Sequence, residues 1–161
     1  MLTHIFTPAQ CARCKLCCNF RRASAWETPA LEAELADRLL HAGVPLQQRE
    51  DGSCTFCLSY RTDDPEETAN CPMLNPSSGC TLPRGDRPFE CRIWPLRLMR
   101  TEQQRLALGL YKHCPALEPA VRDTLVREAT GPMLPALLEF ARRCPQAVRP
   151  ADPAYSIIWQ E

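Results

Sequence analysis

Cysteine is the residue type whose number and spacing point most directly to chemistry in this chain. Eleven cysteines occur in 161 residues, several times the ordinary usage, so they are unlike scattered core residues. Four of them form the run Cys11-Ala-Arg-Cys14-Lys-Leu-Cys17-Cys18, in which two Cys-x-x-Cys steps overlap. A tight turn at that spacing places two sulfurs on the same side, close enough to bind one ion at about 2.3 Å each. The spacing therefore favours metal ligation.

The run from Cys11 to Cys18 matches the first three ligands of a bacterial ferredoxin, but the fourth cysteine follows at once instead of after three residues. Neighbouring residues such as Cys17 and Cys18 are expected to point their side chains in different directions, which indicates more than one metal centre. Both zinc and an iron–sulfur cluster accept thiolates at these spacings. A disulfide framework is disfavoured because the cysteine count is odd and the N-terminus shows no secretion signal.

Two further regions carry cysteines. Cys54 and Cys57 form another Cys-x-x-Cys pair, and the Asp51-Gly52 turn signal before them fits a loop that closes over a metal. Residues 79–96 contain Cys80 and Cys91 among three prolines, which fix φ and remove backbone donors. We therefore expect a rigid loop followed by a short strand there, and no helix.

Arginines accompany the cysteines of residues 79–96. A four-thiolate zinc site carries a formal charge near −2, which nearby guanidinium groups can offset while they hydrogen-bond to sulfur. Arg87 and Arg92 lie closest to Cys91 in the sequence and are the candidates for this supporting role.

On these motifs the chain resembles the YkgJ-type cysteine-cluster family, which is described as a zinc- or iron-chelating domain and is defined by Cys-x-x-Cys-x-x-Cys-Cys. The resemblance runs from Cys11 to about Pro115 and includes the segment Arg87-Pro88-Phe-Glu-Cys91-Arg92. It implies metal binding and no general reaction, although a related domain occurs in a flagellin lysine methylase. The motifs and the resemblance together give the candidate metal ligands Cys11, Cys14, Cys17, Cys18, Cys54, Cys57, Cys80, Cys91 and Cys114. Cys71 is a further candidate ligand, and Cys144 falls outside the pattern.

The rest of the chain predicts the elements that must position these residues. A helix is expected from Thr28 to Gly43, with Thr28 as its cap and Pro29 in its first turn. Alternating residues in 96–99 and 105–111 predict a hairpin that turns through 101–104. Two short helices are expected at 118–129 and 132–143, followed by an extended tail from residue 145. The fold class is therefore α+β: a small, irregular, metal-stapled domain with a short β-hairpin and a few short helices, the last two C-terminal.

Length and charge limit the remaining choices. A chain of 161 residues predicts a single domain, 1–161, with a metal-ligand region of about 11–115, a helical part of about 116–144 and a tail of 145–161. Nineteen basic and nineteen acidic residues cancel, which removes the broad electrostatic attraction on which nonspecific nucleic-acid binding depends. No apolar stretch is long enough to span a membrane, so we expect a cytoplasmic protein.

These observations favour a metal-binding protein whose multi-cysteine zinc or iron–sulfur centre is mainly structural. One alternative is an iron–sulfur redox protein or an enzyme component, including one related to methyl transfer. A second is a zinc-ribbon-like adaptor that binds a protein partner, for which the apolar tail of residues 155–159 is the candidate surface. The sequence contains no phosphate-binding loop and no His-Glu-x-x-His, which favours a non-enzymatic protein, while a Cys/His nucleophile pair stays open.

Overall fold

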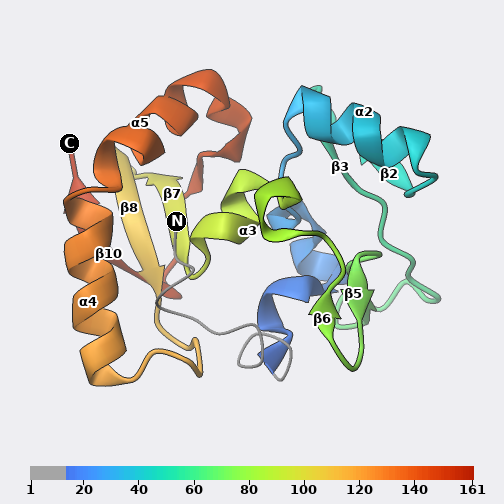
Figure 1. Ribbon diagram of the computed structural model, residues 1–161, viewed down its shortest axis with the longest axis horizontal. Coiled ribbons are helices and arrows are strands. Elements are labelled where there is room, and N and C mark those ends of the chain that lie inside the picture. Colours follow the sequence, from blue (N-terminus) through green and yellow to red (C-terminus); the bar gives the residue numbers. More distant parts are fainter. Residues whose placement is uncertain (1–13) are drawn as a thin grey trace. The chain divides into compact units, whose positions relative to one another are not determined.

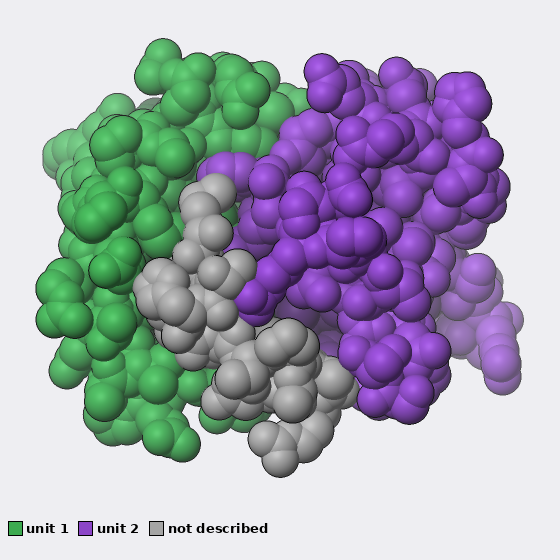
Figure 2. Space-filling model, in the orientation of Figure 1, with its two compact units in different colours: residues 1–7, 93–161 green, residues 8–92 purple. Residues whose placement is uncertain are grey.

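The computed structural model describes residues 14–161 (Figure 1), and Cys11 lies outside the described residues. The chain has an α+β fold of short helices and short, mostly antiparallel strands. It divides into two compact units, coloured separately in Figure 2. Within the described residues, the unit that comes first in the chain comprises residues 14–92 (purple, unit 2 in the key of Figure 2), and the other comprises residues 93–161 (green, unit 1 in the key). We call them the first and the second unit in this chain order. The hairpin after residue 95 thus belongs with the C-terminal helices and not with most of the cysteines.

The first unit contains three two-stranded sheets and little helix. Its pairs are β1 with β4, β2 with β3 and β5 with β6, all antiparallel. The elements in chain order are η1 (Leu16–Cys18), β1 (Asn19–Arg21), η2 (Arg22–Glu27), α2 (Ala33–His41), β2 (Leu46–Gln48), β3 (Cys54–Phe56), β4 (Thr68–Asn70), β5 (Leu74–Asn75), β6 (Gly79–Cys80), η3 (Arg84–Asp86) and α3 (Phe89–Ile93).

Helix α2 confirms the expected helix but begins later than predicted. The cap is Glu32, whereas Thr28 ends η2 and its hydroxyl donates to the Ala25 carbonyl. The prediction that Thr28 caps the helix was wrong because its hydroxyl has this partner in the preceding turn and the chain stays extended up to the cap. The helix ends as expected: Gly43 has φ 75°, and the Val44 N–H donates to the Leu39 carbonyl at 2.9 Å.

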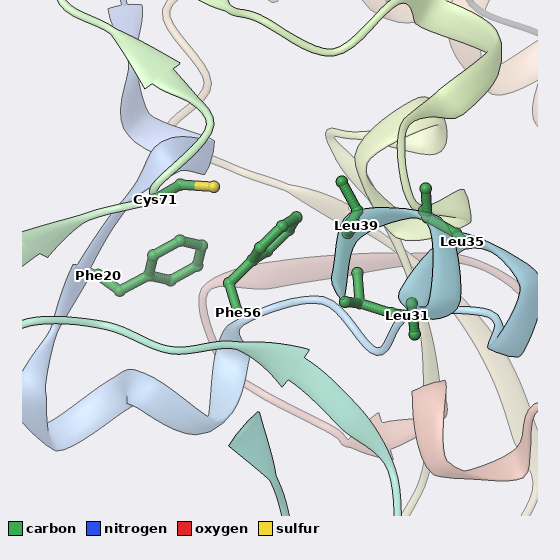
Figure 3. Packing of buried hydrophobic residues seen from close by; sticks show 7 residues of the cluster. Phe20, Leu31, Leu35, Leu39, Phe56 and Cys71 are labelled. Atoms are coloured by element: carbon green, nitrogen blue, oxygen red, sulfur yellow. The ribbon is translucent and has the colours of Figure 1, made fainter. Parts of the chain in front are cut away.

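A small apolar cluster holds the first unit together. Leu31, Leu35 and Leu39 pack with Phe20 and Phe56, and Ala36 and Cys71 complete the buried set. Figure 3 shows the three leucines on one side of Phe56, and Phe20 with Cys71 on the other. Burying each leucine stabilises the unit by roughly 1.5–3 kcal/mol. The cluster is small for a unit of this length. Much of the unit therefore consists of connecting segments that make few apolar contacts of their own.

The second unit is built on a four-stranded sheet in the order β10-β8-β7-β9. Strands β7 (Leu96–Arg100) and β8 (Leu106–Tyr111) form the expected antiparallel hairpin, and Gln104 adopts φ 61° in its turn. Strands β9 (Arg149–Pro150) and β10 (Tyr155–Gln160) complete the sheet. Gly109 leaves space for its neighbours, since a Cβ there would overlap the end of the Met99 side chain and approach the Tyr155 Cβ to 3.0 Å.

The remaining predictions of helical structure concern the two C-terminal helices and residues 79–96. The two C-terminal helices are confirmed as α4 (Pro119–Thr130) and α5 (Leu134–Arg143). Helix α3, together with η3, contradicts the prediction that residues 79–96 contain no helix. The reason is that Pro88 immediately precedes α3, and a proline at a helix start removes an N–H that would have no partner within the helix in any case.

The C-terminal tail is part of the sheet of the second unit. Residues 155–160 form β10, which pairs antiparallel with β8 and contains a bulge between Ile157 and Trp159. Tyr155 is buried beneath Arg97, whose guanidinium lies 4.5 Å from the ring centroid. The tail therefore docks on its own chain, but it is not extended from residue 145 as predicted, because residues 145–147 form the 3₁₀ helix η4 (Pro145–Ala147). No helix in residues 14–161 is long and apolar enough to cross a membrane.

Candidate metal centre

The ten cysteines from Cys14 to Cys144 are all reduced, with no disulfide among them. Two of them are placed by a short hairpin in the first unit. Strands β5 and β6 pair so that Leu74 lies opposite Cys80, and Cys71 lies just before β5, where its carbonyl accepts the Leu74 N–H at 2.9 Å. The connection is tight because the Asn75 side chain accepts backbone N–H groups from both residues that follow Pro76. The hairpin thus brings Cys71 and Cys80 to the same end of the unit.

Cys18 reaches this position through the pairing of β1 with β4. Asn19 lies opposite Asn70, and one step further along, the Cys71 N–H donates to the Cys18 carbonyl at 2.8 Å. Cys17 precedes it in η1, and the Sγ atoms of Cys17 and Cys18 are 3.9 Å apart and hydrogen-bonded. The expectation that these neighbouring side chains point in different directions was therefore wrong, because the η1 turn puts both sulfurs on one side.

Cys91 comes from α3, which is anchored to the segment before α2. On one side of Cys91, the Glu90 carboxylate accepts the Ala30 N–H at 2.6 Å. On the other side, Arg92 forms an ion pair with Glu32 at 3.2 Å. The two contacts fix the short helix in place and so fix the position of the Cys91 sulfur.

The four thiols Cys18, Cys71, Cys80 and Cys91 act on one another electrostatically. Burial raises the pKa of Cys71 to about 12, and negative charge at Cys18 and Cys80 adds to the effect. Burial also raises the pKa of Cys80, and it raises that of Cys91 well above the ordinary value; charge at Cys18 contributes in both cases. The β1–β4 pairing and the β5–β6 hairpin bring Cys18, Cys71 and Cys80 together, and the mutual charge effects include Cys91. We call these four thiols, which come from η1, the segment just before β5, β6 and α3, the thiol cluster.

The thiol cluster has features that stabilise thiolates. The backbone N–H of Met73 lowers the pKa of Cys71, and that of Leu82 lowers the pKa of Cys80, each through a hydrogen bond to sulfur from the residue two positions later. At Cys18 the hydrogen bond from Cys17 is the largest influence and outweighs burial, so the pKa of Cys18 is lowered. Burial and mutual repulsion of these thiolates would be relieved by a bound cation.

Arg87 is a cationic side chain whose charge acts on these thiols. Its Nε donates to the Leu82 carbonyl at 3.2 Å, and its charge lowers the pKa of both Cys18 and Cys80. Arg92, the other predicted supporting arginine, pairs with Glu32 and lies 5.4 Å from the Phe89 ring centroid. Arg92 therefore orients α3, while Arg87 supplies positive charge to the sulfurs.

The cysteine sulfurs of the thiol cluster are donors of the type that a thiophilic metal prefers, but their positions do not form a binding site. An all-thiolate set suits zinc or an iron–sulfur cluster and does not suit magnesium or calcium. Yet in residues 14–161 no three side chains of the types His, Cys, Asp and Glu stand close enough, as they are, to hold one ion. The sulfurs share a region without forming a coordination sphere, so a metal could be held there only if side chains rotated.

The other predicted ligands fall in different places. Cys54 lies in the extended strand β3 and packs against the apolar cluster, so the tight turn expected between Cys54 and Cys57 is not formed. Cys14 immediately precedes the turn that carries Cys17 and Cys18, and its thiol is half-buried. Cys114 is buried in the second unit.

Cys71 is the cluster member that sequence reasoning treated only as a further candidate. The signal that could have placed it is the segment Asn75-Pro-Ser-Ser-Gly79, a turn sequence flanked by Cys71 and Cys80. A hairpin closed by that turn brings the two cysteines together.

Comparison of the chain with protein-family models, with curated proteins and with solved structures finds no match. The case for a metal centre therefore rests on the residues and their geometry.

Proposed function

We propose that this chain is a metal-binding protein in which Cys18, Cys71, Cys80 and Cys91 hold a zinc ion or an iron–sulfur cluster whose main role is structural. The observation that supports the proposal is that η1, the β5–β6 hairpin with the segment just before it, and α3 carry four mutually interacting thiols. Buried thiols without a metal gain nothing from this proximity, because each thiolate raises the cost of ionising the next.

The structural role follows from the small apolar cluster of the first unit. Binding of a structural zinc by four cysteines contributes about 10 kcal/mol or more to folding. A ligand set drawn from η1, the β5–β6 hairpin and α3 would join segments of the chain that share few apolar contacts. The metal would thus stabilise the folded first unit, as a larger apolar core stabilises other domains.

The test is metal analysis of protein purified without oxygen, combined with its absorption spectrum. We expect about one metal centre per chain, with visible absorption if it is an iron–sulfur cluster and none if it is zinc. Cys80→Ser and Cys91→Ser should each lose most of the metal, whereas Cys144→Ser, in the second unit, should retain it. Equal metal content in all three variants would refute the ligand assignment.

A further inference from the structure

The ladder between β1 and β4 continues by one step to Cys18 and Cys71. Asn19 lies opposite Asn70, and beyond this pair the Cys71 N–H donates to the Cys18 carbonyl at 2.8 Å. Residues that face each other at a hydrogen-bonded position of an antiparallel ladder have Cα atoms about 5.5 Å apart. A disulfide needs a Cα separation of about 4.4–6.8 Å. The backbone therefore holds these two cysteines at a separation that suits a disulfide.

The side chains of Cys18 and Cys71 also lie on the same face of the ladder. Side chains two positions apart in a strand share a face, and the residues two positions further along, Phe20 and Ala69, are both buried. Cys71 belongs to the apolar cluster, and Cys18 packs against that cluster. Figure 3 shows Cys71 beside Phe20, on the same side of Phe56. Both sulfurs therefore face the apolar interior, as a bond between them requires.

Cys17 is a poorer partner for Cys18, although their Sγ atoms are 3.9 Å apart. The peptide bond that joins the two residues is trans, which sets their Cα atoms about 3.8 Å apart. This separation is shorter than a disulfide accepts. Cys80 lies opposite Leu74 in its own hairpin. Cys71 is therefore the cysteine that strand pairing aligns with Cys18.

We propose that Cys18 and Cys71 form a reversible disulfide by exchange with a small-molecule disulfide, which makes the first unit responsive to redox conditions. This inference goes beyond the proposed function, because it concerns the chain with no metal bound. Formation of the bond leaves Cys80 and Cys91 as thiols, so the oxidised chain no longer presents the four thiols of the thiol cluster.

The exchange has two steps. Cys18 is half-buried and Cys71 is buried, so the Cys18 thiolate attacks the small disulfide first. A bond forms from the Cys18 sulfur to one half of the small molecule, and the other half leaves as a thiolate. Cys71 then loses its proton and attacks the Cys18 sulfur, and the second half leaves. Two protein thiols are oxidised and one small disulfide is reduced to two thiols, so atoms and electrons balance.

The β1–β4 ladder selects the partners in this reaction. Cys18 and Cys71 are far apart in the chain. Without the ladder, loop closure favours cysteines that are close in the sequence, such as Cys54 and Cys57. A ladder that opens and closes still directs the reaction, because the disulfide captures the two strands when they pair. The identity of the disulfide therefore reports whether the ladder brings its two cysteines together.

The experiment equilibrates metal-free, full-length protein with mixtures of reduced and oxidised glutathione, alkylates the remaining thiols and maps the disulfides by peptide mass spectrometry. We expect the Cys18–Cys71 disulfide as the main product, and an excess of reduced glutathione should reverse it. Cys71→Ser should stop at a mixed disulfide between Cys18 and glutathione, whereas Cys17→Ser should still form the Cys18–Cys71 disulfide. In concentrated urea, disulfides between cysteines close in the sequence should replace it.

Three results would overturn the inference. A main product that joins Cys17 to Cys18 would show that the ladder does not select the partner. Cys71 that stays reduced while other cysteines are oxidised would show that it does not resolve the mixed disulfide. The same products with and without urea would show that the folded chain does not direct the reaction. The protein is free of metal throughout, so failure of the chain to bind a metal would refute the proposed function alone.

Discussion

Metal affinity should depend steeply on pH, because the thiol cluster binds metal only after losing protons. The pKa of Cys71 is raised to about 12, and the pKa values of Cys80 and Cys91 are also raised. At pH 6–7 these three thiols therefore hold their protons in the metal-free protein. Metal binding expels the protons, so raising the pH favours the bound form.

The size of the effect follows from the number of protons. Each proton released changes the binding free energy by about 1.4 kcal/mol per pH unit. Three protons give about 4 kcal/mol, so the apparent association constant should rise roughly 10³-fold between pH 6 and pH 7. Three protons is a lower bound, because Cys18 would add up to one more and its lowered pKa reduces that contribution.

The assay is competition for Zn²⁺ against a chelator of known proton linkage at several pH values, under reducing conditions without oxygen. In Cys71→Ser one of these protons is missing, so the logarithm of the association constant should rise by about one less per pH unit than in the wild-type protein. Cys144→Ser is the matched control and should keep the wild-type slope. A wild-type slope of one or less would refute the reasoning, since fewer than the three raised thiols would then be ligands.

Three further substitutions test separate parts of the structure. Arg87→Gln should weaken Zn²⁺ binding, because it removes the charge that lowers the pKa of Cys18 and Cys80. Arg105→Gln, in the exposed β7–β8 turn, is the control and should leave Zn²⁺ binding unchanged. Equal affinities of the two variants for Zn²⁺ would contradict the role given to Arg87. Leu39→Ala should lower the free energy of unfolding by about 2–5 kcal/mol in urea titrations, because this 5%-exposed side chain packs in the apolar cluster. Leu40→Ala, on the exposed side of α2, is the control and should change the free energy of unfolding little. Gly109→Ala should lower the melting temperature of the second unit because its Cβ would overlap Met99, and an unchanged melting temperature would show that the sheet can relax around it.

The sequence predicted best where local pattern and tertiary packing agree. The hairpin of β7 and β8, the two C-terminal helices and the end of α2 at Gly43 were all predictable, because alternation, helical spacing and a positive-φ glycine act over a few residues. The helix start failed at Thr28, where a contact to the preceding turn replaced the expected cap. The many prolines of residues 79–96 led to the prediction that no helix forms there, but Pro88 precedes α3 instead of interrupting it.

The candidate site could be predicted only in part from the sequence, for a different reason. Spacing identifies cysteines that are close in the chain, but the thiol cluster is assembled by long-range pairing. Cys18 meets Cys71 through the ladder between β1 and β4, and no local pattern encodes that partnership. The same limit affected Cys54, whose Cys-x-x-Cys spacing predicts a turn although the residue lies in a strand paired with β2.

The central claim is that a thiolate-bound metal holds the first unit together, and amide hydrogen exchange before and after metal removal tests it most directly. The reduced protein is stripped with a strong chelator, and exchange is followed by mass spectrometry. The claim predicts loss of protection across residues 14–92, including α2, while the sheet of the second unit, β7 and β8 above all, keeps its protection as an internal control. Unchanged protection in residues 14–92 after complete metal removal would contradict it.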